Sequence, residues 1–255
     1  AIIEYRNAIQ QDNRFGDARY KLALAYIKAN DGTRALEEAV RAADLLPESV
    51  DAQIQAANLL ILAGRYADAQ DRANAVLKRD PRDVRATVAL GNALAGLRDL
   101  DGAVAQLEEA IRLDPTRAGS YTNLATLQLS AGRLKNAETA YLEAVAKAPE
   151  SVPSRLAIAQ FYLLTSKPRE AEPHLQVALQ AKPRDVVVNR FAAAFYQATG
   201  HADKAELYFR TAVDADGSSR ARLALAEYYI GASRLPEATA VLEALASDKE
   251  VGSSA

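Results

Sequence analysis

The sequence is marked first by what it lacks. The 255-residue chain contains no cysteine, no methionine and no tryptophan, with only 5 phenylalanines, 12 glycines and 9 prolines. Without cysteine the chain forms neither disulfides nor thiolate metal sites, but this absence fits a reducing and an oxidising compartment equally well. The scarcity of glycine and proline leaves few segments that can be long loops.

Positive charge and long apolar runs are lacking too. The net charge is −2 and the pI is near 5.9, so no basic excess is present to neutralise phosphates, which argues against a nucleic-acid partner. No apolar run approaches the roughly 20 residues that a membrane helix needs, so this sequence predicts no membrane insertion. The chain opens at Ala1 inside a helical pattern, without a signal segment. We therefore expect a soluble piece of a longer protein, from cytoplasm or periplasm, whose N-terminal part is missing.

What the chain does contain is alanine and leucine. It is 49% apolar and 25% charged, which is ordinary for a soluble protein and sufficient for a continuous core. Small apolar residues in such quantity favour closely packed helices over sheets. The Ala- and Arg-rich style is also typical of bacterial proteins.

An internal period of 34 residues organises the whole chain. Prolines recur at this spacing, and two columns of small residues keep the same spacing until they slip by one near the end, which fits one residue deleted between Gly217 and Ala226. Three independent columns with one period indicate a repeat protein. The columns are Pro47, Pro81, Pro115, Pro149 and Pro183; Ala35, Ala69, Ala103, Ala137, Ala171, Ala205 and Ala238; and Ala23, Ala57, Gly91, Ala125, Ala159, Ala193 and Ala226.

This period resembles that of the tetratricopeptide repeat family, whose unit is a helix, a tight turn and a second helix. Counted from the first residue of each repeat, the resemblance rests on a large residue at position 7, a small one at position 8, a large one at position 11 and Ala at position 20. The implied repeats, numbered 1 to 7, begin at Gly16, Val50, Val84, Ala118, Val152, Val186 and Ser219.

The resemblance implies an all-α fold, a right-handed α-solenoid of stacked antiparallel helix pairs. Residues 1–15 are predicted to hold the second helix of a truncated repeat, residues 16–246 seven helix pairs, and residues 247–255 a tail. Gly64, Gly132 and Gly200 follow first helices and are expected in the left-handed conformation of a helix C-terminus.

Two departures from the family pattern stand out. Gln128 occupies position 11 of repeat 4, where the other repeats carry Tyr or Leu. The tryptophan of position 4 is absent throughout, and that column instead reads Arg19, Gln53, Thr87, Tyr121, Arg155, Asn189 and Arg222.

By resemblance to the family, the first helix of each repeat lines a concave groove with its positions 2, 5, 9, 12 and 13. Position 9 is polar in five of seven repeats and is asparagine in two consecutive ones, Asn58 and Asn92. An amide offers a donor and an acceptor, so a row of amides can hold an extended peptide backbone. The predicted groove residues are Tyr20, Leu24, Ile54, Asn58, Ile61, Leu62, Arg85, Asn92, Thr126, Leu129, Leu156, Gln160, Leu163, Arg190 and Glu227.

The sequence thus predicts a non-catalytic scaffold that binds a protein or peptide segment in its groove, with no cofactor. Ile54 and Val88 stand four residues before the two asparagines, where some family members place a carboxylate-clamping lysine, so that clamp is missing. A different hypothesis is an assembly module that forms a weak homo-oligomer through uncapped ends, using Val241, Leu242 and Leu245 on the last helix. A third, an enzyme or its regulatory domain, depends on the missing N-terminal part.

Catalytic and metal-binding patterns are absent from the sequence. Only two histidines occur, His174 and His201, 27 residues apart in different repeats, whereas a structural zinc usually takes four ligands. Neither GxGxxG nor GxxxxGK[ST] occurs, so no phosphate-binding loop is predicted. Carboxylate pairs such as Glu37–Glu38 fall on solvent-facing stretches, where the shaped pocket that general acid–base chemistry needs is not expected.

The position-20 column generates a stability prediction. Ala137 should lie where two helices cross, so Ala137→Leu should destabilise the protein by about 1–3 kcal/mol through overpacking and lower its thermal midpoint. A variant that melts with the parent would show that the repeats are assigned in the wrong register.

Overall fold

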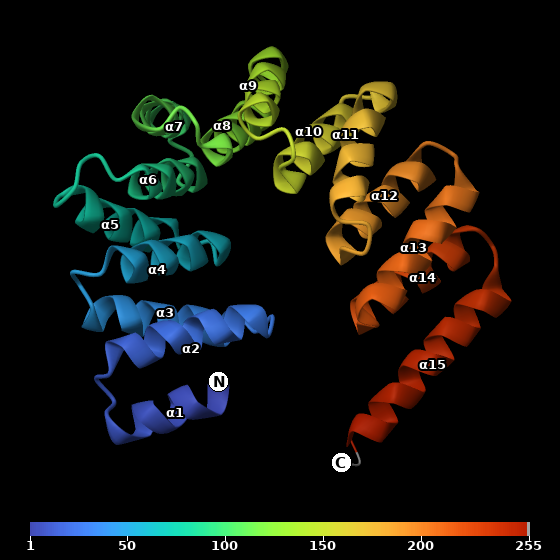
Figure 1. Ribbon diagram of the computed structural model, residues 1–255, viewed down its shortest axis with the longest axis horizontal. Coiled ribbons are helices and arrows are strands. Elements are labelled where there is room, and N and C mark those ends of the chain that lie inside the picture. Colours follow the sequence, from blue (N-terminus) through green and yellow to red (C-terminus); the bar gives the residue numbers. More distant parts are fainter. Residues whose placement is uncertain (254–255) are drawn as a thin grey trace. The chain divides into compact units, whose positions relative to one another are not determined.

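The computed structural model describes the backbone of residues 1–253 and the side chains of residues 1–247. Within this part the chain forms fifteen helices and no strands (Figure 1). A lone helix, α1 (Ile2–Gln11), precedes seven helix pairs. The first helices of the pairs are α2 (Gly16–Lys28), α4 (Val50–Leu62), α6 (Val84–Gly96), α8 (Ala118–Ser130), α10 (Val152–Leu164), α12 (Val186–Ala198) and α14 (Ser219–Gly231). The second helices are α3 (Gly32–Leu45), α5 (Tyr66–Leu77), α7 (Leu100–Leu113), α9 (Leu134–Lys147), α11 (Pro168–Ala181), α13 (Ala202–Asp216) and α15 (Leu235–Ser253).

Every first helix begins at the residue where the sequence columns place the start of a repeat. Five of these helices have a side-chain cap, whereas α2 and α8 have none. In a cap, the side chain before the helix accepts a hydrogen bond from a backbone N–H of the first turn and satisfies a donor that the helix leaves free. Serine or aspartate does this at Ser49, Asp83, Ser151, Asp185 and Ser218. The prolines of the 34-residue column stand just after the second helices, as expected.

The chain divides into two compact units, the N-terminal unit Ala1–Lys147 and the C-terminal unit Ala148–Ala255. In the N-terminal unit each helix from α1 to α8 packs against the next one along the chain. The first helices also contact one another, α4 with α6 and α6 with α8. In the C-terminal unit α10 to α13 pack in the same succession, with α10 against α12, and α14 packs against α13 and α15. Figure 1 shows this succession in each unit. The all-α helical-repeat solenoid is therefore confirmed.

The small residues at positions 8 and 20 lie in the core. The alanines of both columns are at most 3% exposed, and most are fully buried. Gly91, the one glycine in these columns, shows how close the helices are: a Cβ there would lie 3.0 Å from Cγ of Leu107 and 3.3 Å from the carbonyl oxygen of Ala103. Small side chains are needed at these positions because the backbones of paired helices approach closely.

A left-handed residue closes the first helix of every repeat at position 15. The three predicted glycines have φ of 74°, 72° and 79°. Four non-glycine residues adopt the same conformation, Asn30, Arg98, Ser166 and Ser233, with φ between 58° and 66°. In all seven turns the next N–H donates to the carbonyl of position 11, as in Arg65 to Leu60 at 2.8 Å, which is the bond of a Schellman motif.

The polar residues at position 4 replace the missing tryptophan by hydrogen bonding. Four of them donate to the carbonyl six residues earlier, in the connection that precedes the first helix, and so tie that connection to the helix. The bonds run from Arg19 to Asn13, Tyr121 to Pro115, Arg155 to Pro149 and Asn189 to Pro183.

The end of the chain differs from the expected tail. Helix α15 continues to Ser253, so no helix boundary falls at residue 247, and residues 254–255 lie outside the described part. In the described residues no helix combines the length and the apolar character of a membrane span.

Tyrosines at position 11 connect consecutive repeats in the C-terminal unit. The hydroxyl of Tyr196 donates to Glu172 at 2.8 Å, and that of Tyr229 donates to Glu206 at 2.9 Å; both glutamates belong to the preceding repeat. The carboxylate of Glu206 also forms ion pairs with Arg234, at 2.5 Å, and with Arg210, at 2.8 Å. Arg234 first, then the bonds from Tyr229 and Arg210, lower the pKa of Glu206 to about 2.

The left-handed column predicts a stabilising substitution. Arg98→Gly should raise the free energy of unfolding by about 0.5–1 kcal/mol. It relieves the strain of a left-handed residue with a side chain, about 1–2 kcal/mol. Part of this gain is offset because glycine makes the unfolded chain more flexible, about 0.5–1 kcal/mol. Gly132→Ala, the reverse change at the equivalent position, should be destabilising. Urea unfolding of both variants measures this, and equal midpoints for all three proteins would contradict it.

The Glu206 cluster predicts acid sensitivity of the last repeats. Its pKa is lower in the folded than in the unfolded chain, where it is about 4.3, so its stabilisation is complete above that value and is lost as the pH falls toward 2. Glu206→Gln should therefore lower the thermal midpoint at pH 7 and have a shrinking effect toward pH 2. Glu243→Gln, on an exposed part of α15, is the control. A deficit that stays constant with pH would rule out this electrostatic origin.

Candidate functional site

The predicted groove residues of the N-terminal unit come from α2, α4, α6 and α8, and most of them are accessible. Leu62 is 82% exposed, Asn58 and Arg85 are exposed, and Tyr20, Leu24, Ile61, Asn92 and Leu129 are half-buried. Because α4 contacts α6 and α6 contacts α8, residues at the same repeat position on these helices are neighbours. We call this surface the first-helix face.

The two asparagines of this face have free amides. Asn58 on α4 and Asn92 on α6 stand 34 residues apart at position 9, on helices in contact. Within the described residues neither side-chain amide has a hydrogen-bond partner. Each therefore keeps its donors and its acceptor for water or a ligand.

A charged pair crosses the same face near the helix N-termini. Arg85 donates to Asp51 at 2.6 Å, and the two residues are again 34 apart, at position 2 of successive repeats. Its hydrogen bond to Asp51 raises the pKa of Arg85. Burial, followed by the charge of Asp51, raises the pKa of Tyr20. Opposite charges at the repeat spacing were a usable signal for this pair, and the sequence reasoning missed it.

Two predicted groove residues behave differently. Ile54 is only 8% exposed and belongs to a core cluster with Leu60 and Leu90, so its assignment to an accessible groove was wrong: position 5 of α4 packs between repeats. Thr126 is exposed, but its hydroxyl lies 2.9 Å from the carbonyl of Thr122 and 3.1 Å from the hydroxyl of Tyr141. It is thus partly engaged within the chain.

The C-terminal unit carries its own set of predicted groove residues. Leu156 and Leu163 are half-buried on α10, while Gln160 and Glu227 are exposed. Arg190 on α12 is half-buried, and its Nε is buried without a hydrogen-bond partner within the described residues. The three first helices of this unit, α10, α12 and α14, also carry exposed apolar side chains, at Leu164, Val187, Leu223 and Ile230.

The predicted end contacts are only partly accessible. Leu242 is 38% exposed, but Leu245 is 7% exposed and Val241 is half-buried, lining a cavity with Leu225 and Tyr229. Leu245 packs within its own chain, so the expectation that it forms an end contact was wrong.

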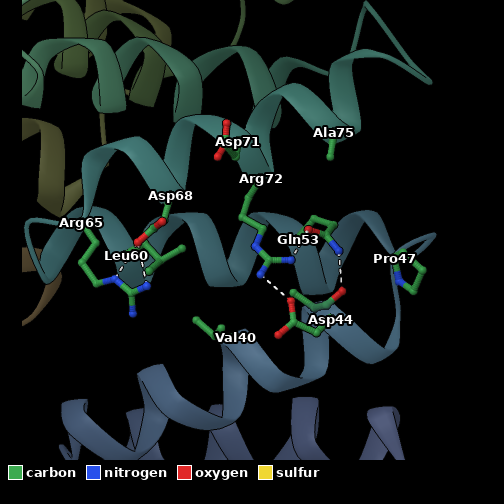
Figure 2. Close-up of a pocket in the computed structure, with 11 residues that line it drawn as sticks. Val40, Asp44, Pro47, Gln53, Leu60, Arg65, Asp68, Asp71, Arg72 and Ala75 are labelled. Carbon is green, nitrogen blue, oxygen red and sulfur yellow. Dashed lines mark hydrogen bonds and ion pairs between the residues drawn. The ribbon is translucent and has the colours of Figure 1, made fainter.

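The sequence reasoning also missed the second-helix cavities, which recur between successive second helices with a first helix as floor. One of about 390 Å³ lies between α3 and α5 over α4 (Figure 2). One of about 340 Å³ lies between α13 and α15 over α14, and one of about 400 Å³ lies between α7 and α9 over α8. No pattern in a single repeat indicates them, because each is closed by residues from two repeats.

The histidines serve packing and hydrogen bonding in the structure. His174 stacks on Tyr162 and its Nδ1 lies 2.9 Å from Nη1 of Arg155. Burial, followed by the charge of Arg155, lowers the pKa of His174. In the described part of the chain no group of three or more His, Cys, Asp or Glu residues could hold a metal ion.

Three solved structures share this fold at low sequence identity. A thermophilic TPR protein of Thermus thermophilus is 21% identical, with a TM-score of 0.64 over 72% of this chain and 98% of that one. Yeast Tom70 is 19% identical, with a TM-score of 0.72 over 95% of this chain and 53% of Tom70. A tetratricopeptide repeat protein of Parabacteroides merdae is 14% identical, with a TM-score of 0.65 over 88% and 90%. At these identities the likeness is one of fold.

Family membership rests on the sequence match. None of the curated proteins matches the chain. The family model described as tetratricopeptide repeat matches residues 54–118 and 122–186, together just over half of the chain. With seven helix pairs in the same register around these matches, the chain belongs to the tetratricopeptide repeat family.

Proposed function

We propose that this chain is a non-catalytic protein-interaction scaffold, and that the first-helix face of the N-terminal unit holds an extended segment of a partner protein. The observation that carries the proposal is the pair of free amides at Asn58 and Asn92, presented by neighbouring first helices. Amides at a regular spacing can bond successive peptide groups of an extended backbone, whatever its side chains are.

Apolar side chains beside the amides support binding. Leu62 is almost fully exposed at the C-terminal end of α4, and Ile61 and Leu129 are half-buried at position 12 of repeats 2 and 4. Apolar groups collected on one face beside unpaired amides are typical of a binding surface. They would take up apolar side chains of the segment while the amides bond its backbone.

Charge on this face favours a segment without a critical terminal carboxylate. Arg85 is already bonded to Asp51 and also lies 3.3 Å from Asp83. Position 5 beside Asn58 is the buried Ile54 and not a lysine. The first-helix face of this unit therefore favours recognition of an internal, extended stretch of a partner.

The test is a double substitution, Asn58→Ala with Asn92→Ala. If each amide bonds the partner backbone, each is worth about 0.5–1.5 kcal/mol, so the double variant should bind about 5- to 150-fold more weakly. Stability should barely change, because alanine favours helix and no buried partner is orphaned. Affinity capture identifies a partner, and calorimetry with its synthetic binding segment measures the loss.

The matched control is Asn7→Ala, which removes an exposed asparagine of the same unit from α1, outside the first-helix face. It should leave affinity unchanged. An unaltered affinity in the double variant would show that Asn58 and Asn92 only face water and do not bind the partner. A large drop in the thermal midpoint would instead show that they support the fold.

A further inference from the structure

The cavity over α8 contains the departure that the sequence shows at position 11. Gln128 is 6% exposed, lines this cavity of about 400 Å³, and its Oε1 has no hydrogen-bond partner within the described residues. A buried amide oxygen without a donor is costly and is rare in folded proteins. The remaining lining residues are Glu108, Ile111, Tyr121, Leu124, Asn136, Thr139, Ala140 and Glu143.

In repeats 6 and 7 the preceding second helix supplies the hydrogen-bond partners of position 11. The hydroxyl of Tyr196 bonds to Glu172 and accepts from Gln176, at 2.8 Å each. The equivalent residues for Gln128, 68 positions earlier, are Val104 and Glu108. Neither a valine side chain nor a carboxylate can donate to an amide oxygen. The orphaned oxygen therefore follows from the residues of two adjacent repeats.

The cavity over α4 contains an arginine that donates to an amide oxygen. In Figure 2 the guanidinium of Arg72 reaches between Gln53 and Asp44. Its Nη1 lies 3.4 Å from the amide oxygen of Gln53, and its Nη2 lies 2.5 Å from the Asp44 carboxylate.

The cavity over α14 is also lined by an arginine, which comes from the preceding second helix and meets position 11 of its repeat. There Arg210 donates to the hydroxyl of Tyr229 at 3.1 Å and pairs with Glu206 at 2.8 Å. In both cavities a guanidinium supplied by the chain meets an uncharged oxygen and a carboxylate.

The cavity over α8 has several acceptors among its lining residues and no arginine. Ala140 stands 68 residues after Arg72, at the same position of its repeat. Gln128, Glu108 and Glu143 line the cavity, and within the described residues neither glutamate carboxylate is in an ion pair. Ile111 and Leu124 form apolar walls. The site is acidic and rich in acceptors, and its volume of about 400 Å³ is open to a ligand.

We propose that the cavity between α7, α8 and α9 binds a guanidinium group on an apolar stem, supplied from outside the chain by an arginine of a partner protein or by a free guanidino compound. The planar fork of five N–H donors matches two carboxylates and an amide oxygen, and the stem packs on Ile111 and Leu124. The residues that form this site are distinct from Asn58 and Asn92, so the proposal stands whether or not the first-helix face binds a peptide.

The experiment is an NMR titration of the whole chain with N-acetyl-arginine methylamide, followed at the backbone and side-chain amides of Gln128 and Asn136. Saturable shifts are expected there, with a dissociation constant on the order of 1 mM or below for one side chain. The matched norleucine compound, which has the stem without the guanidinium, should give none. Equal binding of both compounds would overturn the proposal. Agmatine distinguishes the sources: tighter binding of the capped arginine indicates a peptide, and equal binding indicates a free compound.

Two variants test the site itself. Ala140→Arg supplies the missing guanidinium from within, as Arg72 does, and should weaken binding of the capped arginine at least tenfold. Gln128→Leu introduces the residue type that repeat 2 has at this position, Leu60, and removes the unpaired acceptor. It should weaken binding of the capped arginine and leave the thermal midpoint unchanged. Glu150→Gln and the Asn58→Ala/Asn92→Ala pair are controls that should bind as the parent does. A folded Gln128→Leu or Ala140→Arg variant with parental affinity would refute the assignment.

Discussion

Close approach of helices at small residues is the constraint on which the rest of the structure depends. Each repeat places one small residue at position 8 of the first helix and one at position 20 of the second, and the alanines there are almost completely buried. At Gly91 even a methyl group would press on Leu107 and on the backbone of Ala103. Because the backbones come this close, the large residues around them interlock, and the apolar surface of one helix pair is buried against the next.

Stability built from such neighbouring contacts leaves each repeat free to vary its polar residues. The position-4 side chains tie down the preceding connection with whatever donor they have, be it arginine, tyrosine or asparagine. Position 11 is leucine in repeats 2 and 3, and in repeats 6 and 7 it is a tyrosine that bonds back to the previous repeat. In a repeat protein these exchanges are tolerated, because each one affects only adjacent repeats.

The same tolerance produces surfaces that differ from repeat to repeat, and those differences are where binding is to be sought. On the first-helix face of the N-terminal unit, two amides stand free beside exposed Leu62, whereas Thr126 at the same position is engaged with Tyr141. Between the second helices, two cavities are lined by an arginine that donates to an oxygen of the first helix, while the third has an alanine in place of Arg72 and an amide oxygen without a donor. Both sites depart from a regular pattern: one is an accessible polar face, and the other is a cavity with a buried amide oxygen that has no donor within the described residues.

By itself the sequence determined the repeat register, because a period of 34 residues in prolines and small residues is a local, repeated signal that steric packing imposes on every repeat. The starts of the first helices and the three left-handed glycines follow from it. The sequence did not predict the left-handed conformation of four non-glycine residues, because the turn imposes it on residue types that carry no sequence signal for it. These residues are Asn30, Arg98, Ser166 and Ser233. Only the tertiary structure decided the burial of Ile54 and Leu245, the Asp51–Arg85 bond and the second-helix cavities, because each depends on which side chains of two adjacent repeats meet.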